Sequence, residues 1–233
     1  MFWYELLKLI RGATRHEKER YKMRNGLMTR AMWVLFAPTF KKHLPILGVS
    51  DSNGVMGKAR EKYRAIIEII PPFGRNDVLI LNLISAAEIA AIYLGLDPKP
   101  SCEKMKEYYG TSMDDSRIMR MYLRSINNYS EKYQKSLAKQ AKVSQLSDNP
   151  YSWRFRFLPG KSLDTFDAVF DRCGIHHLFC TLGISEITPA MCAYDYGMAK
   201  WTNTIFTRES TLGSGGSVCD CHYRNARQHR KEK

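Results

Sequence analysis

Apolar residues recur at helical spacing through roughly the first 148 residues of the chain. Between Phe2 and Phe40 the pattern is strongly basic and predicts one or two amphipathic helices. The cluster Asp51-Ser-Asn-Gly54 predicts a turn. A helix is expected to follow over residues 57–70, because its isoleucines share one face and the prolines that come next cannot continue it.

The longest apolar run covers residues 78–96 and has the length of a membrane span. A polar stripe crosses it at helical spacing, made by Asn82, Ser85 and Glu88. A carboxylate in the middle of a membrane span would be costly in lipid, so we predict no membrane span here. The run instead predicts a buried helix over Val78–Leu94, capped by Asn76 or Asp77.

Two further helical segments are expected over Cys102–Tyr109 and Met113–Ala141, which are rich in Met, Tyr, Lys and Arg. The second carries a stripe at alternating steps of four and three: Tyr122, Ile126, Tyr129, Tyr133 and Leu137. Such a stripe is typical of a helix face that packs on a core.

At Asn149 the apolar period changes from 3.6 to 2, which indicates a change from helices to strands. In chain order the pattern predicts strands over 153–157 and 166–170, helices over 173–182 and 188–201, and strands over 204–210 and 218–223. Gly183 ends the first of these helices, and Thr188 is expected to cap the second.

This order predicts an α+β fold, in which a helical N-terminal part precedes an antiparallel four-stranded sheet with two helices on one face. We expect a helical region at 1–148, an α+β module at 149–225 and a basic tail at 226–233. The N-terminal helices would cover the module or a partner subunit, and in the second case the protein would be a homo-oligomer.

Charge and cysteine content narrow the classes of function. The net charge is +13, but no finger, helix-turn-helix or aromatic-basic RNA motif accompanies it, so we expect no nucleic-acid partner. The N-terminus lacks the basic start and the cleavage site of a signal peptide, which predicts a cytoplasmic protein with reduced thiols. Six cysteines in 233 residues do not indicate a disulfide scaffold.

Chemistry-bearing residues concentrate between Phe166 and Arg224, which holds five of the six cysteines. Cys173 lies where a strand meets a helix, and backbone N–H groups at a helix start lower a thiol pKa. Arg172 would add positive charge, and His176 or His177 would exchange protons with the thiol. Cys173 is therefore a candidate nucleophile.

Three other patterns have both a functional and a structural interpretation. Cys173, His177 and Cys180 share a helix face, which suits either a metal or simple packing. Cys192 and Asp195 point the same way from the second helix, where a buried carboxylate is an ion pair or a substrate anchor. In the last strand, cysteines 219 and 221 face opposite to Asp220 and His222.

Three ordered motifs resemble the L-2-amino-thiazoline-4-carboxylic acid hydrolase family. They are Phe166-Asp-x-x-Phe-x-x-Cys173, Leu182-Gly-x-x-Glu-Ile-x-Pro-x-x-Cys192-x-x-Asp195 and Arg208-x-x-Thr211-Leu-x-x-Gly-Gly-x-x-Cys219-Asp220. The resemblance covers the last third of the chain and implies hydrolysis of a cyclic amidine, whose thiazoline ring opens to a carbamoyl product. The chain departs from the family at Cys221, which stands where an aromatic residue is expected.

The residue types suit this chemistry. A thiolate attacks the amidine carbon, a carboxylate holds its N–C–N group, and a histidine moves protons. The expected catalytic residues are Cys173, His177, Cys192, Asp195, Cys219 and Asp220. The expected substrate-binding residues are Arg172, His176, Arg208 and Thr211, with the two arginines available to the substrate carboxylate.

Two alternatives remain open at this point. Many methionines and an aromatic content of 12% would suit a non-catalytic module that binds a small or haem-like ligand. A metal-dependent hydrolase would use Cys173, His177 and Cys219 as ligands of zinc or another divalent ion. The main hypothesis needs no cofactor and takes a small-molecule substrate.

Overall fold

A computed structural model describes residues 26–229 of the chain. Residues 2–25 of the predicted N-terminal helices and residues 230–233 of the predicted basic tail lie outside the described residues. The helical part comprises α2 (Leu27–His43), the 3-10 turn η1 (Leu44–Leu47), α3 (Ser52–Ile69), α4 (Ile80–Gly95), α5 (Cys102–Asp115), α6 (Arg117–Ser125) and α7 (Glu131–Ser144).

Serine caps explain where several of these helices begin. The side chains of Ser101, Ser116 and Ser130 accept hydrogen bonds from backbone N–H groups in the first turns of α5, α6 and α7. These N–H groups have no partner inside a helix, so each cap stabilises its helix by about 1 kcal/mol. The single segment predicted over Met113–Ala141 is therefore wrong, because the caps divide it among three helices.

Two other predicted helix starts are also wrong. Asp51 is not part of a free turn, since it caps α3 by accepting a hydrogen bond from Gly54, and the helix begins at Ser52. Helix α4 begins at Ile80 after Leu79, which has a φ of 62°. Asp77 does not cap this helix, because its carboxylate accepts hydrogen bonds from Gly74 and Asn149 instead.

The C-terminal part has the predicted order of strands and helices, which confirms the α+β fold class. It comprises β1 (Arg154–Pro159), β2 (Thr165–Arg172), α8 (Gly174–Thr181), the turn η2 (Ser185–Ile187), α9 (Thr188–Trp201), β3 (Thr204–Thr207), the turn η3 (Leu212–Ser214), β4 (Cys219–Asn225) and α10 (Ala226–His229). Thr188 is the first residue of α9 and makes no side-chain cap bond, so its predicted role as a cap is wrong.

The four strands form one antiparallel sheet in the order β1-β2-β4-β3. Strand β4 occupies an inner position, where Cys219 lies opposite Phe170 and Cys221 lies opposite Ala168. Strand β3 ends at Thr207, three residues earlier than predicted, so that Arg208 leaves the sheet edge. This early end brings Arg208 to α9, as described below.

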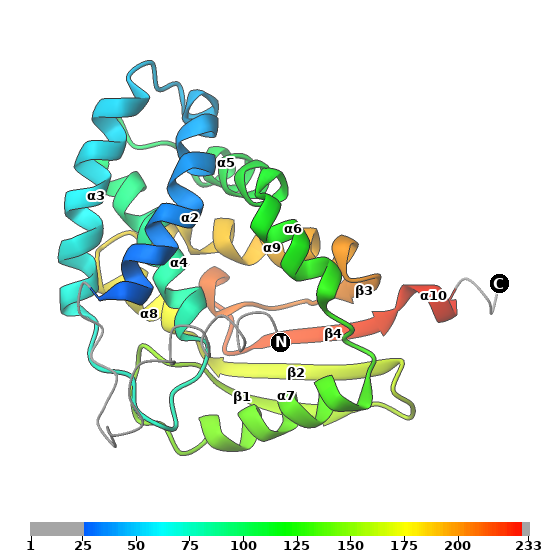
Figure 1. Ribbon diagram of the computed structural model, residues 1–233. Helices are drawn as coiled ribbons and strands as arrows, with labels where there is room; N and C mark the ends of the chain where they lie inside the picture. Colours follow the sequence, from blue (N-terminus) through cyan, green and yellow to red (C-terminus); the bar gives the residue numbers. More distant parts are fainter. Residues whose placement is uncertain (1–25, 230–233) are drawn as a thin grey trace.

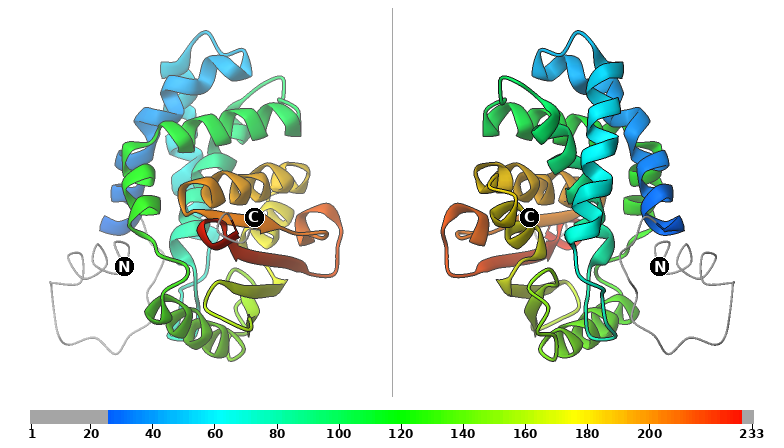
Figure 2. Two further views of the ribbon diagram at one scale, coloured as in Figure 1. Left: turned by 90° about the vertical axis from the view of Figure 1, so that its right-hand side faces the viewer. Right: turned by 90° about the vertical axis from the view of Figure 1, so that its left-hand side faces the viewer.

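Helices α8 and α9 lie between the sheet and the N-terminal helices (Figures 1 and 2). Helix α5 runs along α9, and α9 packs in turn on β3, while α7 lies against β1 on the opposite side of the molecule. The N-terminal helices thus cover the module that carries the cysteines. One hydrophobic core continues across this junction, from Phe36 on α2 to Tyr194 on α9.

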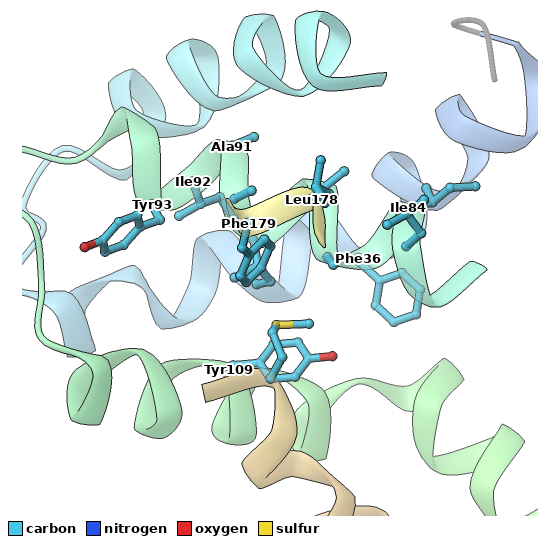
Figure 3. Close-up of a cluster of buried hydrophobic side chains, with 14 of the residues drawn as sticks. Phe36, Ile84, Ala91, Ile92, Tyr93, Tyr109, Leu178 and Phe179 are labelled. Atoms are coloured by element: carbon cyan, nitrogen blue, oxygen red, sulfur yellow. The ribbon is translucent and has the colours of Figure 1, made fainter. Parts of the chain in front are cut away.

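The centre of this core is a cluster of large side chains from α2, α4, α5 and α8 (Figure 3). Phe36, Ile84, Leu178 and Phe179 are each at most 1% exposed. Complete burial of such side chains stabilises a fold by about 2 kcal/mol each. Because α4 is buried on nearly all sides, its apolar run needs no membrane to explain it.

No helix among residues 26–229 combines the length and the apolar character that crossing a membrane requires.

Candidate functional site

An ion pair between Asp195 on α9 and Arg208 after β3 lies at the junction of the helices and the sheet. The guanidinium Nη1 of Arg208 is 2.5 Å from Oδ2 of Asp195, and its Nη2 donates to the carbonyl of Cys192 at 2.7 Å. The rings of Tyr196 and Phe206 also contact this guanidinium. Only 7% of the Arg208 side chain is exposed, whereas Asp195 keeps 35% accessible.

Cys173 follows the end of β2, and its thiol interacts electrostatically with Asp195. It precedes α8 in an extended conformation, and the backbone N–H groups of Ile175 and His176 favour its thiolate. The next residue is Gly174, where a Cβ atom would overlap the carbonyl of Tyr151. Glycine at this position allows the start of α8 to pack directly against the backbone of Tyr151.

Cys192 and Cys219 lie under the loop formed by η3. The backbone N–H of Leu212 donates to Sγ of Cys219 at 3.3 Å. A Cβ atom on Gly213 would lie 3.4 Å from Sγ of Cys192 and would overlap Thr188, so only glycine allows this close approach. The loop therefore covers two thiols that come from different elements.

The cysteines interact with one another and with the ion pair. Ionisation of Cys173, Cys192 or Cys219 is opposed by the charge of Asp195, and the thiols also oppose one another's ionisation. Burial is the main cause that raises the pKa of Cys173 to about 11 and that of Cys192 to about 12. The expectation that the helix start gives Cys173 a lowered pKa is wrong, because burial outweighs the two backbone N–H groups.

Burial also raises the pKa of Asp195, while the charge of Arg208 and its hydrogen bond lower it. The same pairing raises the pKa of Arg208 above its ordinary value, although burial opposes this. Because the two groups are in direct contact, we treat them as an ion pair near neutral pH. Oδ1 of Asp195 has no hydrogen-bond partner among the described residues.

A cavity of about 150 Å³ lies beside this ion pair. Its walls come from α2, α4, α5, α6, α8 and α9, and five methionines line it: Met32, Met113, Met119, Met191 and Met198. Tyr109, Tyr122 and Tyr194 add aromatic surface, and Asn82, Ser85 and Asp195 are polar groups in the walls. Of the ten predicted site residues, Asp195 alone lines the cavity.

Several predicted residues lie away from the thiols. The ring of His177 packs edge-on against Tyr151, with 4.6 Å between centroids. Arg172 donates to the carbonyl of Ser147 at 2.6 Å. Nδ1 of His176 is 3.5 Å from Oγ1 of Thr188, and Nε2 is 3.6 Å from Sγ of the exposed Cys180. Each of these side chains has a partner near its own position. Among the described residues, no histidine side chain forms a hydrogen bond with the Cys173 thiol.

Asp220 and Thr211 hold the loop that covers the thiols. The carboxylate of Asp220 accepts hydrogen bonds from the backbone N–H groups of Glu209 and Ser210. The hydroxyl of Thr211 accepts from the N–H of Ser214 at 3.0 Å. Asp220 faces away from Cys219, as the strand alternation predicts, so its position is that of a loop support.

Cys221 is 4% exposed and packs with Ala199 and Phe206 in a small second cluster. The thiol therefore fills a core position and also interacts with Arg208. Within residues 26–229, no three or more His, Cys, Asp or Glu side chains are grouped closely enough to hold a metal ion. The set Cys173, His177 and Cys219 is thus not assembled as ligands.

Glu88 on α4 is a buried carboxyl group that the sequence reasoning did not place in a site. It is fully buried, and neither oxygen has a hydrogen-bond partner among the described residues. Burial raises its pKa well above the ordinary value. Ser85, one turn earlier, is also buried and lines the cavity beside Tyr109. In the sequence, the polar stripe of Asn82, Ser85 and Glu88 within the apolar run could have indicated this group.

Replacing Glu88 with glutamine is expected to flatten the pH dependence of stability. With a raised pKa in the folded state, the wild-type protein is most stable below the pKa of the unfolded chain and loses stability as pH rises. Each pH unit between the two pKa values should lower the wild-type free energy of unfolding by about 1.4 kcal/mol relative to the variant. Urea unfolding between pH 5 and pH 8 measures this difference.

The matched control is Glu61→Gln, because Glu61 is exposed on α3. This variant should keep the wild-type slope. Equal slopes for the wild-type protein and Glu88→Gln would mean that Glu88 does not hold its proton in the folded state.

Comparison of the sequence with known protein families gives a match. A family model described as L-2-amino-thiazoline-4-carboxylic acid hydrolase matches residues 82–223. No curated protein and no solved structure matches the chain. The match begins in α4 and extends far beyond the last third of the chain, so it includes both Ser85 on the cavity wall and the C-terminal motifs. Because it covers more than half of the chain, the protein belongs to the L-2-amino-thiazoline-4-carboxylic acid hydrolase family.

Proposed function

We propose that this protein is a hydrolase that opens the ring of a 2-amino-thiazoline, a cyclic amidine, to a carbamoyl product. The observation that carries the proposal is the convergence of Cys173, Cys192 and Cys219 on the ion pair of Asp195 and Arg208. Asp195 also lines a cavity, so one carboxylate joins the thiols to a space for a small molecule.

Asp195 is the proposed anchor of the amidine. Its Oδ2 is held by Arg208, which fixes the orientation of the carboxylate. Oδ1 is then available to accept a charge-assisted hydrogen bond from an N–H of the amidinium group. Such a bond contributes about 2 kcal/mol and aligns the amidine carbon with respect to the thiols.

Cys173 is the proposed nucleophile, because two backbone N–H groups at the start of α8, those of Ile175 and His176, favour its thiolate, whereas Cys219 has only the N–H of Leu212. Its sulfur forms a bond to the amidine carbon while the bond from that carbon to the ring sulfur breaks. The proton of the Cys173 thiol goes to the ring sulfur, which leaves as a thiol. The enzyme is then an S-linked isothiourea.

Water completes the reaction. Its oxygen adds to the same carbon, the bond to the Cys173 sulfur breaks, and that sulfur regains a proton. The product carries a urea group, and its former ring sulfur is a free thiol. The backbone N–H groups of Ile175 and His176 stabilise the negative charge on Cys173 in both steps. This route uses neither His177, whose ring packs on Tyr151, nor Arg172, which donates to the carbonyl of Ser147.

The cavity also bears on the alternative of a non-catalytic module. Its volume of about 150 Å³ can hold a single ring but not a haem-like ligand. A thiazoline is of the right size. The nearby thiols and the ion pair add reactive groups that simple ligand retention would not require.

Thiol alkylation is expected to inactivate the protein at a rate that rises with pH. Because the pKa of Cys173 is about 11, the thiolate fraction and hence the rate should increase about tenfold per pH unit between pH 7 and pH 9. A 2-amino-thiazoline should slow the loss of activity. The measurement is residual ring-opening activity, with peptide mapping of the modified cysteine, after exposure to iodoacetamide.

The background for this experiment is Cys180→Ser, because Cys180 is the exposed thiol and would react first. Inactivation that does not depend on pH, or that proceeds equally fast with the thiazoline present, would contradict the assignment of Cys173.

A further inference from the structure

The cavity walls carry no positive charge. Among the described residues, no Lys, Arg or His side chain lines the cavity, and Asp195 is the ionisable acid in its walls. A carboxylate placed among methionine and aromatic side chains would lose its hydration without gaining a cation, which costs several kcal/mol. The cavity is therefore unfavourable for an anionic group.

Neither arginine expected to bind a substrate carboxylate lines the cavity, although the Nε of Arg172 is buried without a hydrogen-bond partner among the described residues. Arg208 places one terminal nitrogen on Asp195 and the other on the carbonyl of Cys192. Arg172 donates to the carbonyl of Ser147. Moving Arg208 to a substrate would leave Asp195 without its partner, so the substrate would gain a cation only at the expense of the ion pair.

The polar groups that face the cavity can accept hydrogen bonds from N–H groups of a ligand. Ser85 is 7% exposed and lines the cavity, where its hydroxyl interacts with that of Tyr109 and keeps a lone pair for a ligand. The exposed Asn82 lies one turn away on α4, toward solvent. Ser85 and Oδ1 of Asp195 can accept hydrogen bonds from the N–H groups of an amidinium, while the methionines adapt to an apolar substituent.

We infer that the preferred substrate of this protein is a cyclic amidine that carries a small apolar substituent in place of the carboxylate. This inference rests on the proposed function, because it takes the cavity beside Asp195 as the substrate site. The bound molecule is cationic through its amidinium, and the rest of it is a single ring of a size that 150 Å³ can hold.

The test compares two ligands by calorimetry: 4-methyl-2-amino-thiazoline and 2-amino-thiazoline-4-carboxylate. The wild-type protein should bind the methyl compound at least tenfold more tightly. Met198→Lys places a cation in the cavity wall and should reduce this ratio of dissociation constants at least tenfold. The matched control is Met121→Lys, because Met121 is 53% exposed and does not line the cavity, and its ratio should equal the wild-type ratio.

Equal or tighter binding of the carboxylate by the wild-type protein would overturn the inference, and so would identical ratios for the two lysine variants. The wild-type comparison stands even where a variant does not fold. Turnover of both compounds is measured in parallel. A retained preference for the methyl compound with no ring opening of either compound would reject the proposed function alone. Ring opening of the carboxylate with no such preference would reject the inference alone.

Discussion

Replacing Cys173 with serine is expected to lower kcat/KM for ring opening of a 2-amino-thiazoline by at least about 1,000-fold. The hydroxyl of serine is a far weaker nucleophile near neutral pH, and the buried position at the start of α8 offers no histidine contact to activate it. Substrate binding should change little, because Asp195 is intact. The measurement is steady-state kinetics together with calorimetric binding of the substrate.

The control for this variant is Cys102→Ser. Cys102 is also partly buried, and burial likewise raises its pKa, but it lies at the start of α5 and interacts with Glu103 and Lys106 rather than with Asp195. Its activity should remain that of the wild-type protein. Full activity of Cys173→Ser would remove Cys173 from the mechanism and leave either Cys192 or Cys219 as the nucleophile or direct attack by water, which the double variant Cys192→Ser/Cys219→Ser would separate.

Replacing Asp195 with asparagine is expected to lower kcat/KM by roughly 100-fold, which corresponds to about 2.7 kcal/mol. The variant keeps the shape of the side chain but loses the charge that holds both Arg208 and the amidinium. Because the anchor acts on bound substrate and transition state together, the dissociation constant should rise as well. The dissociation constant therefore separates the two variants, because Asp195→Asn should raise it and Cys173→Ser should lower kcat alone.

Asp115→Asn is the matched control for loss of an ion pair. The side chain of Asp115 is 36% exposed, close to the 35% of Asp195, and its carboxylate pairs with Lys42 and His43. Asp115→Asn removes one carboxylate charge, as Asp195→Asn does, but its turnover should equal that of the wild-type protein. If both variants lose activity to the same extent, the effect is one of stability, and thermal unfolding of each variant decides this.

The two variants together distinguish a covalent mechanism from direct attack by water. In a direct mechanism Asp195 would hold the amidine, and the thiols would only fill space around it. Asp195→Asn would then be inactive, while Cys173→Ser would keep its activity. The raised pKa of Cys173 makes this comparison necessary, because a protonated thiol must lose its proton during the attack.

Local patterns in the sequence were sufficient to predict much of the fold. The change of apolar period at Asn149 marks the transition to the sheet, and the order of strands and helices after it is confirmed. Helix starts were predicted less well. Asp51 and Ser116 cap helices in positions where the apolar pattern alone indicated a turn or a continuous helix.

Site prediction was more limited for a physical reason. The sequence identifies residue types, and the motifs around Cys173, Cys192 and Cys219 predicted which segments hold the chemistry. Whether a side chain is free to act depends on its partners in the fold. Arg172 and His177 are chemically suitable, yet one is bonded to the carbonyl of Ser147 and the other packs on Tyr151.

The sequence by itself determined the α+β class, the family and the segments from which the thiols and Asp195 come, since these follow from periodicity and from ordered motifs. Only the tertiary structure decided that Asp195 is paired with Arg208, that the thiols have raised pKa values, and that no Lys, Arg or His of residues 26–229 lines the cavity beside Asp195. Pairing, burial and cavity walls arise from contacts between residues far apart in the chain, such as Ser85 and Asp195, and no local pattern records those contacts.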